Sequence, residues 1–148
     1  MLNKDFREFI ESLNSNKVRY LLLGGYAMAA YGHPRYTKDL DVWIEASEEN
    51  SERLIRALED FGFGDIGINK TDFTQVGQVV QLGYPPNRID LINSPDGVDF
   101  VDCYAKRNEI EVDGLIISLI DIENLKKNKK ASGRLQDLAD VEKLSGES

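Results

Sequence analysis

Lys38-Asp39-Leu40-Asp41-Val42-Trp43-Ile44 is the segment most informative about the fold of this chain. Its apolar residues alternate with two aspartates and a tryptophan, which is the period of a strand with one buried face. Asp39 and Asp41 therefore point to the same side of the strand. Two like charges on one face repel each other. A divalent cation such as Mg²⁺, which prefers oxygen ligands, is the simplest partner that would favour the pair.

Gly24-Gly25 lies upstream, between the apolar run 18–23 and an alanine-rich helical stretch. A glycine turn at the start of a helix exposes backbone N–H groups, which suit a phosphate. Metal-binding carboxylates beside a phosphate cradle indicate phosphoryl or nucleotidyl transfer. Plainer interpretations remain open: the aspartates could be solvated at a turn, and the glycines could only allow close packing of helix on strand.

A third carboxylate lies in Arg88-Ile89-Asp90-Leu91-Ile92, which alternates in the same way. A strand carrying Asp90 beside the Asp39 and Asp41 strand would complete a three-carboxylate site. Two metals in such a site clamp the attacking and leaving oxygens of an in-line displacement. Asp90 would then be a metal ligand or a general base. The alternative is an ion pair with Arg88, because residues two apart share a strand face.

The order of predicted elements indicates an α+β fold, with helices packed on a mixed sheet. Helices are expected over residues 2–13, 25–31, 48–61, 98–105, 119–132 and 137–144, with Ser47 and Ser118 as N-caps of the third and fifth. Strands are expected over residues 18–23, 40–44, 78–83, 87–92, 110–112 and 115–117. Asp113-Gly114 joins the last two strands as a strong hairpin signal.

Composition bounds the function. The 148 residues suit a single domain, 1–148, and no apolar run is long enough to span a membrane. The net charge of −8 disfavours a long nucleic-acid duplex as partner. The lone Cys103 and the absence of a leader-like start lead us to expect a cytoplasmic location.

Taken together, Gly24-Gly25, the spacing Arg35-x-Thr37-x-Asp39-x-Asp41 and the later Asp90 resemble the minimal nucleotidyltransferase superfamily related to DNA polymerase beta. The commonest pattern in that superfamily begins with Gly-Ser. Gly25 stands at the serine position here, as in the branch that includes abortive-infection and toxin–antitoxin nucleotidyltransferases. The resemblance continues through residues 79–90 and 129–140, and it covers residues 20–144.

The resemblance implies a nucleotidyltransferase fold and transfer of a nucleoside monophosphate from a nucleoside triphosphate, often ATP, with release of pyrophosphate. It also implies two Mg²⁺ ions as cofactors, with Mn²⁺ as an alternative. The catalytic and metal-binding residues would be Asp39, Asp41 and Asp90. The nucleotide-binding residues would be Gly24, Gly25, Arg35, Thr37 and Lys130.

Several of these side chains have a second interpretation. Arg35 could bind a phosphate or pair with an acidic neighbour, and Thr37 could orient a carboxylate or cap a turn. Lys130 belongs to a basic helical stretch, 126–134, that is ordinarily a solvated face. We expect Asp137 and Asp140 to pair with Arg134 or Lys130. Trp43 could stack on a base, although core packing is its commoner role.

Three functions remain. The first is an active nucleotidyltransferase whose acceptor hydroxyl belongs to a small molecule, a protein or an RNA end. The second is an antitoxin-type module that masks or modifies a partner toxin. The third is a fold that binds nucleotide without chemistry. The sequence leaves the acceptor, the base preference and the oligomeric state open.

Overall fold

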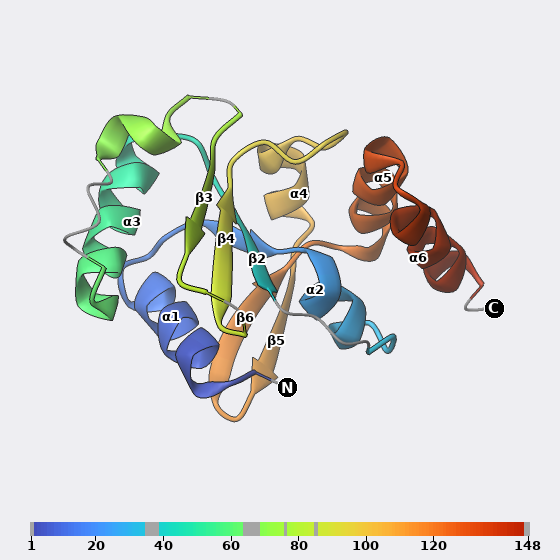
Figure 1. The fold of residues 1–148 in the computed structure, drawn as a ribbon, viewed down its shortest axis with the longest axis horizontal. Helices are drawn as coiled ribbons and strands as arrows, with labels where there is room; N and C mark the ends of the chain where they lie inside the picture. Colours follow the sequence, from blue (N-terminus) through green and yellow to red (C-terminus); the bar gives the residue numbers. More distant parts are fainter. Residues whose placement is uncertain (1, 35–38, 64–68, 76, 85, 147–148) are drawn as a thin grey trace.

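A computed structural model describes residues 2–34, 39–63, 69–75, 77–84 and 86–146. Its centre is a six-stranded sheet in the order β3-β4-β2-β1-β6-β5 (Figure 1). β2 pairs with β4 and β1 with β6 in parallel, and the other neighbours are antiparallel. The predicted α+β class with a mixed sheet is therefore confirmed. The strands are β1 (Tyr20–Leu22), β2 (Asp39–Ile44), β3 (Val79–Leu82), β4 (Arg88–Ile92), β5 (Asn108–Val112) and β6 (Leu115–Leu119).

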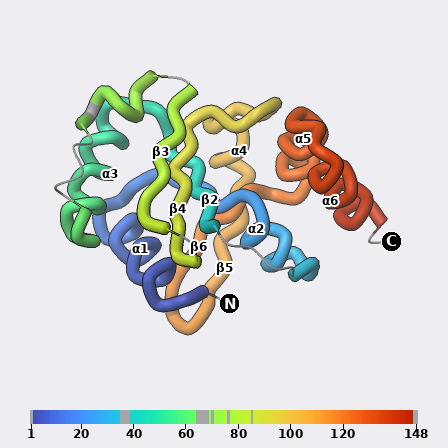
Figure 2. Tube along the Cα trace, in the orientation of Figure 1, coloured from blue at the N-terminus to red at the C-terminus, as the bar shows by residue number. Residues whose placement is uncertain are grey.

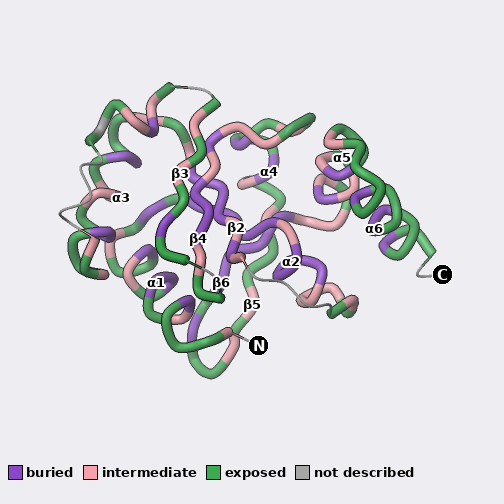
Figure 3. The backbone as a smooth tube through the Cα atoms, in the orientation of Figure 1, coloured by how far each residue is buried: buried purple, intermediate pink, exposed green. Residues whose placement is uncertain are grey.

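Helices cover both faces of the sheet, and the buried residues concentrate on the strands between them (Figure 3). One core lies between the sheet and the first and third helices, and the other lies on the face that carries Trp43. The last two helices lie side by side at one end of the molecule (Figures 1 and 2). The helices are α1 (Lys4–Ser15), α2 (Gly24–Ala30), α3 (Glu48–Phe61), the 3₁₀ turn η1 (Lys70–Phe73), α4 (Phe100–Ala105), α5 (Ile122–Ser132) and α6 (Leu135–Ser145).

Alternation along β2 assigns its residues to the two faces. Leu40 and Val42 belong to the core under α1 and α3, whereas Trp43 belongs to the opposite core, where its ring meets Phe100 edge to face at 5.1 Å. Trp43 is 1% exposed, so the expectation that it packs in the core is confirmed. Asp39 and Asp41 share its face of the strand.

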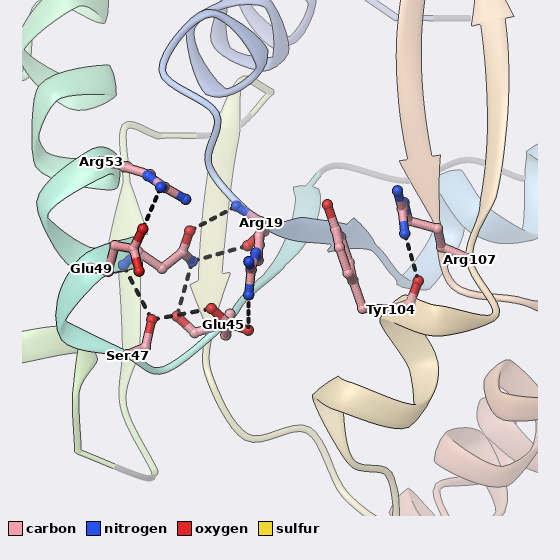
Figure 4. Close-up of polar contacts among 8 residues, drawn as sticks. Arg19, Glu45, Ser47, Glu49, Arg53, Tyr104 and Arg107 are labelled. Atoms are coloured by element: carbon pink, nitrogen blue, oxygen red, sulfur yellow. Dashed lines mark hydrogen bonds and ion pairs between the residues drawn. The ribbon is translucent and has the colours of Figure 1, made fainter.

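Local signals place several element ends as expected. The Ser47 side chain accepts a hydrogen bond from the backbone of Asn50 and so caps α3 (Figure 4). Gly62 ends α3 in the left-handed conformation, with φ of 100°. Asp113 and Gly114 both have positive φ, as the tight turn between β5 and β6 requires. Within the described residues, no helix is both long and apolar enough to cross a membrane.

The predicted helix start at Ser118 is wrong. Ser118 lies in β6, and α5 begins at Ile122 with Asp121 as its N-cap. The reason is a tertiary one: β6 continues to Leu119, which pairs with Leu22 in the centre of the sheet. The other predicted elements within the described residues are present, with their ends shifted by one or a few residues.

Candidate active site

The three predicted carboxylates come together where β2 and β4 run side by side. Asp41 lies opposite Asp90 in the parallel register, and Asp39 lies opposite Arg88 one step earlier. Because the register holds both strands in phase, the side chains of Asp41 and Asp90 project from the same face. Asp90 is 8% exposed, and Asp41 is partly buried. The register thus brings three acidic groups to one face of two neighbouring strands.

The carboxylates disturb each other's ionisation. Burial raises the pKa of Asp41 to about 6, the charges of Asp90 and Asp39 act in the same direction, and Lys129 and Arg134 oppose them. Burial also raises the pKa of Asp90, against the hydrogen bond from Arg88. Water therefore screens the negative charges of these carboxylates poorly.

Arg88 bridges two of the three carboxylates. Its Nη2 lies 2.6 Å from Oδ2 of Asp39 and 3.2 Å from Oδ2 of Asp90, and its Nε lies 3.1 Å from Oδ1 of Asp90. The ion pair between Arg88 and Asp90, which the sequence left open as an alternative, is therefore formed. It is formed in addition to the convergence of the carboxylates, so the two interpretations of Asp90 do not exclude each other.

The glycine turn faces Asp41. Gly24 has φ of 62°, and a Cβ at this position would lie 2.2 Å from Oδ2 of Asp41. The backbone N–H of Leu23 donates to the carbonyl of Asp41 at 3.0 Å, which ties the turn to β2. A side chain at Gly24 would therefore collide with the carboxylate. Arg35 and Thr37, the other residues predicted in this loop, lie outside the described residues.

A cavity of about 410 Å³ opens between Asp41 and the pair α5–α6. Its far wall carries Lys129, which is 4% exposed. Lys129 Nζ lies 2.9 Å from Oδ2 of Asp140 and 3.7 Å from Oδ1 of Asp137. The cavity is lined by Leu23, Gly24, Asp41, Ile92, Ser94, Pro95, Asp96, Asn128, Lys129, Ser132, Arg134 and Asp137.

The basic residue at this wall differs from the expected one. Lys130 is exposed and is not among the residues that line the cavity. Asp137 pairs with Arg134, as expected, at 2.8 Å, whereas the lysine that contacts Asp137 and Asp140 is Lys129. A signal was available: Lys129 follows the buried Leu125 by four residues and so shares its helix face. A nucleotide-binding role for Lys130 stays a prediction.

The types of ligand atom at this site suit a divalent cation. Carboxylate oxygens are the ligands that Mg²⁺ and Mn²⁺ prefer, and Oδ1 of Asp90 is buried without a hydrogen bond of good geometry. Across the residues described, however, no three acidic, histidine or cysteine side chains converge on one ion as they lie. Arg88 contacts both Asp39 and Asp90, so these two carboxylates must turn from Arg88 before they can join Asp41 at an ion.

No protein-family model matches the chain, and no curated protein sequence matches it. Solved structures do. A protein of Thermotoga maritima, provisionally named a nucleotidyltransferase, superposes with a TM-score of 0.61 at 17% identity over 97% of this chain and 91% of its own. The lincosamide antibiotic adenylyltransferase LnuA, with lincomycin bound, gives 0.57 at 16% identity over 100% of this chain and 99% of its own.

A third solved structure agrees. An antigenic nucleotidyltransferase-like protein of Paracoccidioides brasiliensis gives a TM-score of 0.55 at 18% identity, over 97% of this chain and 77% of its own. All three similarities extend over nearly the whole of this chain and over most of the other chain. At sequence identities this low, the similarities establish the fold, and the reaction has to be argued from the residues of the site. The chain has the nucleotidyltransferase fold.

Proposed function

We propose that this protein is a metal-dependent nucleotidyltransferase. It would transfer a nucleoside monophosphate, with AMP as the first choice, from a nucleoside triphosphate to a hydroxyl group of an acceptor. The observation that carries the proposal is the parallel pairing of Asp41 with Asp90 beside Gly24, at a cavity in the nucleotidyltransferase fold.

The charge balance of the site supports a requirement for metal. Six carboxylates lie in the cavity wall or next to it, against three cations. A nucleoside triphosphate is itself strongly anionic, so it would be repelled unless divalent cations entered with it. Asp41, Asp96, Asp137, Lys129 and Arg134 line the cavity, and Asp39, Asp90, Asp140 and Arg88 lie next to lining residues.

The proposed reaction is an in-line substitution at the α-phosphorus. The acceptor oxygen forms a bond to this phosphorus while the bond to the oxygen that bridges the α- and β-phosphates breaks, and pyrophosphate leaves. Asp90, which is buried and whose pKa burial raises, would be the general base for the hydroxyl proton if it does not serve only as a metal ligand. Arg134, whose side chain is 80% exposed at the cavity wall, would balance the charge that develops on pyrophosphate. A bound metal would neutralise phosphate charge and polarise the α-phosphate.

Asp41 and Asp90 would hold that metal, with Asp39 as a third ligand once it turns from Arg88. Gly24 would let phosphate approach the backbone closely, because it has no Cβ to block the turn. The roles of Gly25, Arg35, Thr37 and Lys130 in binding nucleotide stay predictions.

The acceptor is proposed only as a class. LnuA is an adenylyltransferase of a small molecule, and the two chains match over almost their full lengths, so a hydroxyl-bearing small molecule is the first acceptor to test. A protein side chain and an RNA end remain to be tested after it. The alternative of a module that masks or modifies a partner toxin stays a prediction, and a toxin labelled by the experiment below would join the two hypotheses.

Labelled ATP tests the proposal directly. The protein would be incubated with Mg²⁺, fractionated cell extract and ATP carrying the label on either the α- or the γ-phosphate. We expect transfer of the α-label alone, its loss when Mg²⁺ is chelated, and its loss in Asp41→Asn. Transfer of the γ-label would indicate a kinase. No transfer from any nucleoside triphosphate, or equal transfer by Asp41→Asn, would contradict the proposal.

A further inference from the structure

The guanidinium of Arg88 lies where two of the metal-binding carboxylates would have to receive their ion. It contacts Oδ2 of Asp39 at 2.6 Å, and its Nε and Nη2 lie 3.1 and 3.2 Å from the two oxygens of Asp90. All three oxygens contacted belong to carboxylates of the proposed metal site. We propose that Arg88 is a built-in counter-cation that holds Asp39 and Asp90 in the metal-free protein and is displaced when a divalent cation binds. This inference rests on the metal site of the proposed function.

Geometry makes the two occupants exclusive. A carboxylate oxygen that accepts a short charge-assisted hydrogen bond directs its lone pairs at the guanidinium. A metal held by Asp41 and Asp90 and joined by Asp39 needs carboxylate oxygens that Arg88 contacts. Two cations in one position also repel each other strongly where water is scarce. One of the two cations must therefore leave these oxygens. Arg88 can do so because its side chain can rotate away from them.

Arg88 is placed to move without disturbing the sheet. It is the first residue of β4, and its side chain is 29% exposed, compared with 12% for Asp90. Its side chain is thus more exposed than that of Asp90 and about as exposed as that of Asp39, at 27%, although its Nε atom is buried. A change of side-chain rotamer carries it toward solvent while the backbone pairing between β2 and β4 persists.

Displacement has an energetic consequence. Without metal, Arg88 relieves the repulsion between Asp39 and Asp90, so it stabilises the fold. With metal, the ion takes over that task, and breaking the Arg88 bridge weakens the apparent affinity for the metal. Removal of Arg88 should therefore tighten metal binding and destabilise only the metal-free protein. If Arg88 instead stayed in place with and without metal, neither tighter metal binding nor a loss of stability limited to the metal-free protein would be expected.

Titration with Mn²⁺ alone tests the first consequence, using calorimetry or the electron paramagnetic resonance signal of free Mn²⁺. We expect Arg88→Gln to bind Mn²⁺ about tenfold more tightly than the wild type, since a charge at ion-pair distance from partly exposed ligands changes affinity by roughly this order. Unchanged or weaker binding overturns the inference. A wild type that binds no Mn²⁺ up to millimolar concentration would instead remove the metal site, and with it the proposed function.

Arg107 offers a matched control. It pairs with Glu109 two residues further along the chain, at 3.4 Å, as Arg88 pairs with Asp90, and it lies beside Tyr104 next to the opposite edge strand, β5 (Figure 4). Arg107→Gln removes the same charge from the protein as Arg88→Gln does. We expect its Mn²⁺ affinity to match that of the wild type within about twofold. An equal gain in both variants would show a general charge effect and would overturn the role assigned to Arg88.

Thermal unfolding tests the second consequence. In EDTA, Arg88→Gln should melt below the wild type, and saturating Mn²⁺ should close most of that gap. A gap of equal size in both conditions means that Arg88 stays in place when metal binds, which overturns the inference. If Arg88→Gln fails to fold, Arg88→Lys is the variant to titrate with Mn²⁺. It keeps the positive charge but lacks the planar guanidinium that contacts both carboxylates at once. A gain of a few-fold in Mn²⁺ affinity supports displacement, and no gain refutes it.

Discussion

Replacing Asp41 with Asn should stabilise the metal-free protein even though it removes nucleotidyl transfer. Burial and the neighbouring charges of Asp90 and Asp39 raise the pKa of Asp41 from 3.8 to about 6. The charged form is thus disfavoured in the folded state. The folded pKa lies above the unfolded one, so this group's contribution is present in acid and is lost as the pH rises through about 6.

The magnitude follows from that shift. At about 1.4 kcal/mol per pKa unit, and with a discount for partial exposure and relaxation, the ionised carboxylate costs about 1–3 kcal/mol above pH 7. Asn has a similar shape and no charge. For a domain of this size each kcal/mol moves the melting temperature by about 2–4 °C, so we expect Asp41→Asn to melt roughly 2–10 °C above the wild type at pH 8 in EDTA.

The assay is thermal unfolding between pH 4 and pH 8 in EDTA. The advantage of Asp41→Asn should be largest at pH 8 and should become small toward pH 4, where the wild-type carboxyl is protonated in the folded state and close to half protonated in the unfolded state. Glu111→Gln, which removes an exposed charge on β5, is the control and should show no comparable change. A variant that melts below the wild type at pH 8, or a difference that does not depend on pH, would refute the reasoning.

Further expectations concern the rest of the cavity. Lys129→Met leaves buried carboxylates without their cation and should lower the free energy of unfolding by about 3–5 kcal/mol, as measured in urea. Lys130→Met, at an exposed position, should lower it by less than about 0.5 kcal/mol. The reverse order would contradict the placement of α5. Gly24→Ala should destabilise the protein by about 1–2 kcal/mol and also abolish Mn²⁺ binding, because the added Cβ collides with Asp41. Mn²⁺ titration and thermal unfolding curves that match the wild type would show that the turn can move away from Asp41. Gly97→Ala should lower the melting temperature, because its Cβ would lie 2.5 Å from a side chain of α5 and its φ is 76°; an unchanged melting curve would show that the loop between β4 and α4 does not press on α5.

The parts of the site that follow a local period could be predicted from the sequence. Alternation alone assigns Asp39 and Asp41 to one strand face and Asp90 to one face of another strand. Their convergence also needs β2 and β4 to be neighbours in register, which no local pattern encodes. The resemblance to a known fold supplied that step.

The rest depended on contacts between distant segments. Ser118 is as good an N-cap as it is a strand residue, and only the pairing of β6 with β1 decides between the two. Lys129 and Lys130 have the same chemistry; the spacing of four residues from Leu125 favours Lys129, but the burial of Leu125 itself depends on the packing of α5. The position of Arg88 between two strands is likewise a product of register.

A crystal structure with Mn²⁺ and a non-hydrolysable ATP analogue, with the metal located by anomalous scattering, would show whether the aspartates form a metal site. We expect a metal bound by Asp41 and Asp90, in contact with phosphate oxygens, and the guanidinium of Arg88 withdrawn from Asp39. A metal and nucleotide bound elsewhere, with the three aspartates unchanged, would contradict this expectation.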